Sequence, residues 1–306
     1  MENTGTNVNK KIGICGRGGS GKSTVTVFLA RALCERGYDV CVLDADSSNL
    51  GIATALGVDR EPEPLLDYFG GMVFSGGSVT CPVDDPTSLA HATVSLEELP
   101  PRYWSATADG VLLLTAGKMG SLGSGSGCDG PIAKIARDLR IRATGSNSIL
   151  LVDFKAGLED PARGVITGLD WALTVVDPTL PAIRLALEMQ NMVEWLKAGQ
   201  PPATRHLDRP ELVRVALRNY RDARIEQVSV VLNKIRDSQT ENLIRRGLTE
   251  EKIQPIGALR ESDAVSQAWL EGTPLTAWKV LDDARRLARD LECEITRASE
   301  AHAIAN

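Results

Sequence analysis

Short apolar segments alternate with longer segments of helical periodicity along most of the chain. The apolar segments predict buried strands at residues 12–15, 39–43, 111–115, 149–152, 171–176, 228–232 and 253–256. Apolar residues at helical spacing predict helices at residues 25–33, 131–139, 183–196, 211–220, 263–270 and 277–297. Strands that alternate with helices in this way indicate an α/β fold.

Residues 59–110 interrupt this alternation, because they are rich in Pro, Gly and Asp and have weak periodicity. We interpret them as an insertion of loops and short helices, the kind of segment that carries a partner or substrate surface in α/β enzymes. No linker-like run divides the chain, so we expect one domain over residues 1–306. Its C-terminal helix, within 276–306, has one apolar face and should pack on the body of the protein.

The segment after the first predicted strand, residues 16–24, reads Gly-Arg-Gly-Gly-Ser-Gly-Lys-Ser-Thr and fits the phosphate-binding pattern G-x-x-x-x-G-K-[ST]. Glycines let backbone N–H groups turn toward an anion, and the following helix directs its positive end at the same point. We expect Lys22 to neutralise the β- and γ-phosphates of ATP or ADP, and the Ser23 hydroxyl to bind Mg²⁺. The residues expected to contact the nucleotide here are Gly18, Gly19, Ser20, Gly21, Lys22, Ser23 and Thr24.

An acidic pair, Asp44 and Asp46, lies at the end of the second predicted strand. Open α/β sheets bind their ligands at the carboxyl ends of their strands. We therefore expect Asp44 to belong to the Mg²⁺ shell and Asp46 to orient the attacking water. The structural alternative is that Asp46 or Ser47 caps a helix beginning near residue 50.

A third acid, Asp153, ends the most apolar strand of the central region, and Gly157 follows shortly after it. Asp153 would accept the waters of the Mg²⁺ shell, and the Gly157 N–H could reach the γ-phosphate. Residues 153–163 are therefore predicted to form a nucleotide-sensing switch loop. Asn233 follows another strand, where its amide suits a purine edge, although a turn asparagine is an equally simple interpretation.

Composition narrows the functional classes. The 306 residues carry a net charge of −6 and only 4% aromatic side chains, which disfavours a nucleic-acid partner. No apolar run reaches the roughly 18 residues that a membrane span needs, and the polar start lacks signal-peptide character, so we expect a cytoplasmic protein without a membrane partner. Six cysteines without paired spacing predict no disulfides, and Cys15, Cys34 and Cys41 are expected in the core.

The motifs resemble those of the deviant P-loop ATPases, which include the Min and Par spatial regulators and nitrogenase iron protein. They read Gly-x-Gly-Gly-x-Gly-Lys-[ST]-Thr, Leu-Asp-x-Asp, Val-Asp-x-x-x-Gly and Asn-Lys. Within this group the chain looks most similar to the CooC-like maturation ATPases of carbon monoxide dehydrogenase. The resemblance covers residues 11–275 and implies a mostly parallel sheet of seven or eight strands flanked by helices. It also implies an ATP-dependent homodimer that sandwiches two nucleotides face to face.

Two positions depart from the family pattern. Arg17 stands where the family has a signature lysine that reaches the partner's nucleotide, and arginine keeps the charge and adds a planar fork, so we expect a trans arginine finger. The second departure is Ser126-Gly127-Cys128, where CooC-like proteins have Cys-x-Cys. A dimer would then offer two thiolates, fewer than the four of a closed zinc shell. The alternatives for Cys128 are an interfacial metal, such as nickel, zinc or an iron–sulfur cluster, and an unliganded thiol.

The resemblance favours a Mg-ATP-dependent, dimerising ATPase that assists metallocentre maturation, with a client such as carbon monoxide dehydrogenase. One alternative is a spatial regulator of the MinD/ParA type, which the acidic charge and the absence of a basic terminal helix disfavour. Another is an iron–sulfur electron-transfer ATPase resembling nitrogenase iron protein. Residues 153–163 contain no cysteine, so a four-cysteine cluster cannot be assembled from that loop and Cys128.

Overall fold

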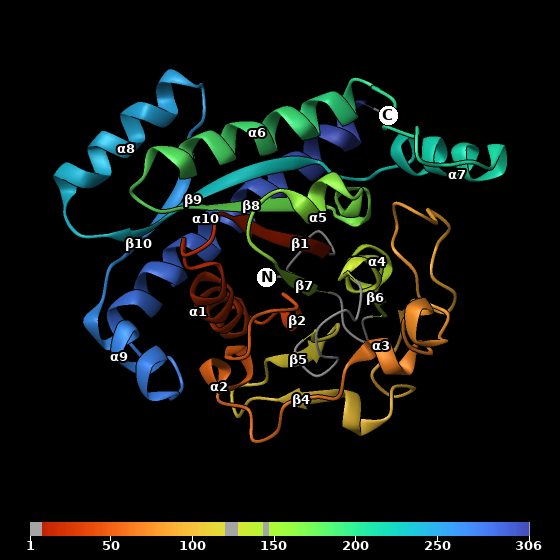
Figure 1. Ribbon diagram of the computed structural model, residues 1–306. Coiled ribbons are helices and arrows are strands. Elements are labelled where there is room, and N and C mark those ends of the chain that lie inside the picture. Colours follow the sequence, from red (N-terminus) through yellow and green to blue (C-terminus); the bar gives the residue numbers. More distant parts are fainter. Residues whose placement is uncertain (1–7, 120–127, 143–146, 306) are drawn as a thin grey trace.

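The computed structural model describes residues 8–119, 128–142 and 147–305, which form a central sheet between two layers of helices (Figure 1). The strands are β1 (Asn9–Gly16), β2 (Asp39–Ala45), β3 (Thr93–Val94), β4 (Trp104–Ala106), β5 (Leu112–Thr115), β6 (Arg140–Ile141), β7 (Ser148–Phe154), β8 (Trp171–Val176), β9 (Gln227–Ile235) and β10 (Pro255–Arg260). Within the described residues, eight of these strands form one sheet, in the order β10-β9-β8-β1-β7-β2-β5-β4. All its neighbouring pairs are parallel except β4 and β5. The α/β fold with a mostly parallel sheet is confirmed.

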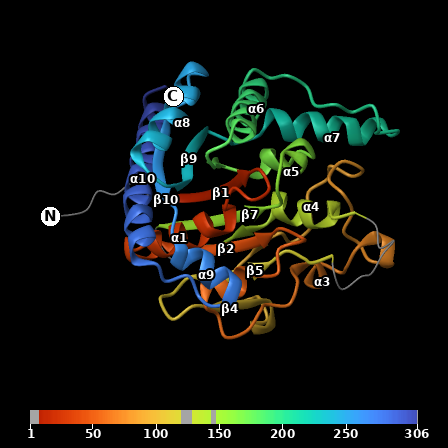
Figure 2. The ribbon, with the colours of Figure 1, turned by 60° about the vertical axis from the view of Figure 1, so that its left-hand side comes forward.

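Helices cover both faces of the sheet. They are α1 (Lys22–Glu35), α2 (Ile52–Leu56), α3 (Leu65–Tyr68), α4 (Gly130–Asp138), α5 (Glu159–Ala162), α6 (Leu180–Lys197), α7 (Pro210–Arg221), α8 (Ser238–Glu250), α9 (Asp263–Glu271) and α10 (Trp278–Ala305), with short 3₁₀ helices η1 (Val73–Ser75), η2 (Pro101–Tyr103) and η4 (Val165–Gly168). Figure 2 shows α1 and α10 to the left of the sheet and α4, α5 and α6 to its right. Within the described residues, no helix has both the length and the apolar character needed to cross a membrane.

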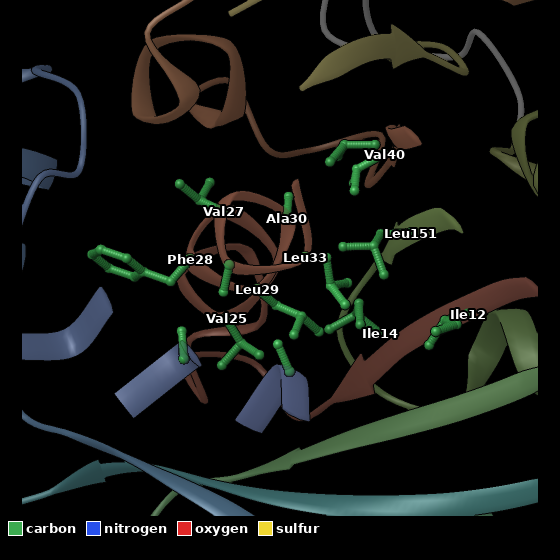
Figure 3. Close-up of a cluster of buried hydrophobic side chains, with 14 of the residues drawn as sticks. Ile12, Ile14, Val25, Val27, Phe28, Leu29, Ala30, Leu33, Val40 and Leu151 are labelled. Carbon is green, nitrogen blue, oxygen red and sulfur yellow. The ribbon is translucent and has the colours of Figure 1, made fainter. Parts of the chain in front are cut away.

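The core explains why the central strands read as continuous apolar runs. Ile12 and Ile14 of β1 belong to the cluster that includes α1 and α10, whereas Cys15 belongs to the cluster on the opposite face. Figure 3 shows Leu29 and Leu33 of α1 beside Ile14. Each such side chain contributes roughly 1.5–3 kcal/mol when it is fully buried. Burial on both faces fixes β1 at the sheet centre, and so fixes the loop that follows it.

Three sequence-based predictions need correction. Residues 59–110 do contain short helices, but they also supply β4, which extends the main sheet, and β3, which pairs with β6. The last strand is Pro255–Arg260 rather than 253–256, since Ile253 packs in the turn before it. Cys34 is only half-buried, because it lies near the end of α1. Its thiol donates to the Asp109 carbonyl. Cys15 and Cys41 are buried as expected. The single domain over residues 1–306 stays a prediction.

Candidate functional site

A pocket of about 530 Å³ lies at the carboxyl ends of β1, β2 and β9. Most of the glycine-rich segment lines it, which brings the predicted nucleotide contacts to one place. The lining residues are Gly18, Gly19, Gly21, Lys22, Ser23, Thr24, Asp46, Asn49, Ala156, Asn233, Lys234, Arg260, Glu261, Ser262, Val265, Ser266, Trp269 and Val280. Of the predicted nucleotide contacts, Ser20 is fully buried within the loop and does not line the pocket, and Gly157 lies next to the lining residue Ala156.

The helix that follows the loop presents a free N-terminus to this pocket. No side chain caps α1, and its first turn holds no acidic residue. Gly21 precedes the helix with a φ of 87°, and a Cβ on it would lie 2.2 Å from Asn233 Nδ2. Only glycine fits there. The first N–H groups of α1 are therefore available to an anion, and the helix dipole favours one.

Lys22 adds a full positive charge to that end of the helix. Its side chain is buried, with 7% exposure, yet its ammonium group forms no hydrogen bond or ion pair within the described part of the chain. Buried lysines are normally paired, because an isolated charge loses its hydration. A lysine that lines the pocket from a buried position, with its ammonium group unpaired beside an uncapped helix terminus, fits a phosphate ligand.

Oxygen ligands suited to Mg²⁺ lie beside Lys22. The Ser23 hydroxyl donates to Asp153 Oδ2 at 2.6 Å and accepts from Asn49 Nδ2 at 2.8 Å. Asp44 is paired with Asp153 in register across β2 and β7. Burial raises the pKa of Asp44 to about 7 and that of Asp153 to about 6, against the opposing effects of Lys118 on Asp44 and of Ser23 on Asp153. Carboxylates that are costly to ionise without a cation fit a divalent ion.

Lys118 is a residue of this site that the sequence analysis did not assign. Its ammonium group donates to Asp44 Oδ2 at 2.6 Å, to the Asp46 carbonyl at 2.8 Å and to the Asn49 carbonyl. It thereby ties the loop between β2 and α2 to the segment after β5. The sequence offered one indication of this role, the position of Lys118 just after a strand. Its proximity to Asp44 depends on the pairing of β5 with β2, which exists only in the folded sheet.

Asp46 lies in the loop between β2 and α2, half-buried at the pocket wall. Its Oδ1 accepts hydrogen bonds from the Ser48 backbone N–H at 2.9 Å and the Ser48 hydroxyl at 2.6 Å. The N-cap of α2 is Gly51, which has no side-chain cap. The alternative that Asp46 or Ser47 caps this helix is therefore wrong.

Three other predicted contacts have protein partners in this conformation. Asn233 Nδ2 donates to the Ser20 carbonyl at 2.8 Å, so its amide braces the glycine-rich loop, and its contact with a purine stays a prediction. The Gly157 N–H donates to the Gly16 carbonyl at 3.0 Å and must leave it to reach a γ-phosphate. The Thr24 hydroxyl accepts from Trp269 Nε1 at 2.9 Å. The 153–163 segment is partly helical, since it contains α5.

Arg17 forms an ion pair with Asp177 of its own chain, with NH1 3.1 Å from Oδ2. Asp177 follows β8, the neighbour of β1 in the sheet. The Arg17 side chain remains 38% exposed. The guanidinium group thus rests at the rim of the glycine-rich loop, within reach of solvent.

Cys128 is half-buried just before α4, whereas Ser126 and Gly127 lie outside the described residues. Next to it, Asp129 accepts from Lys155 Nζ at 2.8 Å, Arg163 NH1 at 2.7 Å and the Ser47 hydroxyl at 3.1 Å. Burial opposes its ionisation, but Lys155 and Arg163 outweigh burial and lower its pKa to about 2.

A second thiol, which the sequence analysis missed, lies near Cys128. Cys81 is buried against Gly130, where an added Cβ would meet its Sγ at 2.5 Å. Within the described residues, no group of three or more His, Cys, Asp or Glu side chains could hold a metal ion.

Comparison with known proteins places these features in context. A family model described as the CobQ/CobB/MinD/ParA nucleotide binding domain matches residues 14–275. An uncharacterized ATP-binding protein of Methanocaldococcus jannaschii is 29% identical over 87% of this chain and 94% of its own. The carbon monoxide dehydrogenase accessory protein CooC of Rhodospirillum rubrum is 30% identical over 61% of this chain and 70% of its own.

Two further similarities are more limited. An iron–sulfur cluster carrier protein of Pyrococcus horikoshii is 52% identical over 48 residues, 16% of each chain. The septum site-determining protein MinD of the same organism, solved with Mg-ADP, has a TM-score of 0.58 at 17% identity and covers 92% of this chain and 95% of its own. At that identity, the structural likeness shows the fold alone.

Proposed function

Because the chain belongs to the family of CobQ/CobB/MinD/ParA nucleotide-binding domains, we propose that it is a cytoplasmic, Mg-ATP-dependent ATPase that dimerises on binding ATP and assists metallocentre maturation. The observation that carries the nucleotide part is Lys22, a buried residue at the uncapped N-terminus of α1 whose ammonium group has no hydrogen bond or ion pair within the described residues and which lines the pocket. The observation that carries the maturation part is the 30% identity to CooC.

The residues at the pocket divide into phosphate and metal ligands. The α1 N-terminus and Lys22 would hold the β- and γ-phosphates, since both present positive charge to the same space. Ser23, Asp153 and Asp44 would hold Mg²⁺ directly or through water. Mg²⁺ supplies neutralisation of the charge that develops on the phosphate oxygens. Lys118 now neutralises Asp44, so it competes with the metal for that carboxylate.

Asp46 would act on the attacking water. Its carboxylate is steadied by Ser48 through Oδ1 alone, which leaves Oδ2 to accept a water proton. A single fixed carboxylate at the edge of a phosphate pocket suits orientation of a nucleophile.

Arg17 would change partners when two protomers close. Its ion pair with Asp177 is partly exposed and therefore weak, so a second nucleotide could compete for the guanidinium group. Two apolar side chains at this edge of the sheet support a dimer face: Leu50 is 74% exposed and Leu180 is 58% exposed. Leu50 follows Asn49, which lines the pocket, and Leu180 begins α6 shortly after Asp177, the partner of Arg17, so a second protomer on this side would cover both.

Mixing two inactive variants tests the trans role of Arg17. We expect Arg17→Ala and Asp46→Asn to be inactive alone and to regain ATP hydrolysis when mixed. In a mixed dimer, the nucleotide on the Arg17→Ala protomer keeps its own Asp46 and receives the partner's Arg17. Phosphate release from the mixture measures this.

The matched control is Asp177→Asn, which removes only the same-chain partner of Arg17 and should retain hydrolysis. A mixture as inactive as its components, with each variant still binding nucleotide, would assign Arg17 to its own protomer instead.

The metal part of the proposal rests on Cys128. Asp129 cannot complete a metal site in this conformation, because two cations and a hydroxyl already occupy its oxygens. The described residues of one protomer therefore do not fit a bound metal, and a site would need the thiolates of both protomers. We propose nickel, zinc or a cluster as the metal at this position, and a metalloenzyme such as carbon monoxide dehydrogenase as the client.

We expect the ATP-bound dimer to hold one metal ion that Cys128→Ser loses. Two thiolates brought together by closure bind a divalent ion better than one thiolate on each separate chain. Metal analysis of anaerobically purified protein, with and without a non-hydrolysable ATP analogue, measures the stoichiometry. Cys293→Ser, on exposed surface of α10, is the control. Equal metal in wild type and Cys128→Ser, or none in both, would leave Cys128 an unliganded thiol.

A further inference from the structure

Asp129 joins the two loops that the nucleotide should move. Ser47, which donates to Asp129 Oδ2, is the residue after Asp46 in the loop that follows β2. Lys155 and Arg163, which also bind Asp129, lie on either side of Gly157 in the segment that follows β7. The Asp129 carboxylate is 8% exposed, and burial makes each of these contacts costly to break without replacement.

The loop that follows β2 also contacts the chain on the N-terminal side of Cys128. The Met119 N–H donates to the Ser47 carbonyl at 3.2 Å, and Lys118 binds the Asp46 and Asn49 carbonyls. Residues 120–127 lie between these anchors and Cys128, outside the described residues. Ser47 thus contacts the protein chain on both sides of that segment, through its carbonyl at Met119 and its hydroxyl at Asp129.

If Gly157 and Asp44 contact the nucleotide and its Mg²⁺ as proposed, both loops rearrange when a γ-phosphate binds. The Gly157 N–H is now occupied by the Gly16 carbonyl, and Asp44 is occupied by Lys118. Freeing either group for the nucleotide shifts a loop whose neighbouring residues bind Asp129. Asp129 is adjacent to Cys128 and precedes α4, whose Ile132, Ala133, Ile135 and Ala136 are buried in the core, so a shift of Asp129 should displace Cys128 more readily than α4.

We propose that Asp129 is a positioning residue that links the two nucleotide loops to Cys128, so that the accessibility of the Cys128 thiol depends on whether ADP or ATP is bound. This inference deepens the proposed function and rests on it. Through Asp129, the γ-phosphate would control when Cys128 is presented to a partner protomer or a client. Arg163 strengthens the link, because it also binds Glu159 and Asp160 of α5 and so carries that helix with it.

The test is the alkylation rate of Cys128 by iodoacetamide, resolved by peptide mass spectrometry, with saturating Mg-ADP or Mg-AMPPNP. Wild type should show rates that differ at least about fivefold between the two nucleotides, the low end of allosteric couplings. Asp129→Asn should bring the ratio to about 1. Asp129→Glu keeps the charge and should restore part of the difference in rate between the two nucleotides. If Asp129 only stabilised the fold, the charge at this position would not control that difference. Cys293 on α10 reports the intrinsic rate in every sample.

Asp85→Asn is the matched control variant. Asp85 is also partly buried and paired with a lysine, Lys134, but it contacts neither nucleotide loop, so its loss should leave the ratio unchanged. If Asp129→Asn does not fold, Ser47→Ala removes one uncharged contact and should reduce the ratio. Nucleotide binding is measured separately. Bound nucleotide with equal Cys128 rates in wild type, or an unchanged ratio in Asp129→Asn, overturns the inference, whereas no nucleotide binding overturns the proposed function beneath it.

Discussion

Asp46→Asn lowers the rate of ATP hydrolysis by about 10²–10⁴-fold and leaves ATP-driven dimerisation intact, if Asp46 orients the attacking water as proposed. Asparagine has nearly the same shape and can still accept the Ser48 hydrogen bonds, so the loop after β2 should keep its conformation. The lost carboxylate acts on the water mainly in the transition state, and nucleotide binding should therefore change little.

Single-turnover phosphate release and nucleotide titration of the same preparation separate the two effects. Asp153→Asn is the comparison, because Asp153 binds Ser23 and is assigned to the Mg²⁺ shell. That variant should lose Mg²⁺-dependent affinity as well as rate. If Asp46→Asn also loses nucleotide affinity, Asp46 belongs to the ground-state metal shell.

Lys22→Ala weakens the binding of Mg-ATP by at least about 100-fold, which corresponds to two charge-assisted hydrogen bonds of about 1.5 kcal/mol each. The substitution should not destabilise the free protein much, because the Lys22 ammonium group forms no hydrogen bond or ion pair in the part of the chain that the structure describes, and the hydrogen bond from Thr26 goes to the Lys22 backbone carbonyl. Loss of binding without loss of folding is the signature of a ligand-binding charge. Calorimetric titration and thermal unfolding measure the two properties.

Lys234→Ala is the matched control, since Lys234 lines the same pocket but is exposed and donates to the Gly19 carbonyl. We expect it to weaken binding by less than about tenfold, the range of an exposed charge contact. Equal losses in the two variants would mean that Lys22 has no privileged contact with phosphate. A fall in the melting temperature of Lys22→Ala would indicate a structural role.

The local parts of this site can be predicted from sequence because their geometry is set by neighbours in the chain. The glycine-rich loop, the start of α1 and the acids at the ends of β2 and β7 all follow from a short pattern next to an apolar run. The register that pairs Asp44 with Asp153 then follows from parallel strands that end at one edge of the sheet.

The contacts that join the loops of the site were missed because they connect segments far apart in the chain. Lys118 and Asp44 are 74 positions apart, and Ser47 and Asp129 are 82 apart. The periodicity of apolar residues does not reveal contacts between residues so far apart in the chain. Asp129 is a further example: in the chain it is the neighbour of Cys128, whereas in the fold its carboxylate forms ion pairs with Lys155 and Arg163. Strand β4 was missed for a different reason, because three residues are too few to show alternation.

The most direct test of the account is the molar mass of the wild-type protein by light scattering, with saturating Mg-ADP and then with saturating Mg-AMPPNP. The ion pair between Arg17 and Asp177 and the exposed Leu50 and Leu180 describe a protomer whose nucleotide face is open. A γ-phosphate should close that face onto a second protomer. We expect a monomer with ADP and a dimer with the ATP analogue. A monomer in both, with the analogue demonstrably bound, would contradict the proposed ATP-dependent dimer.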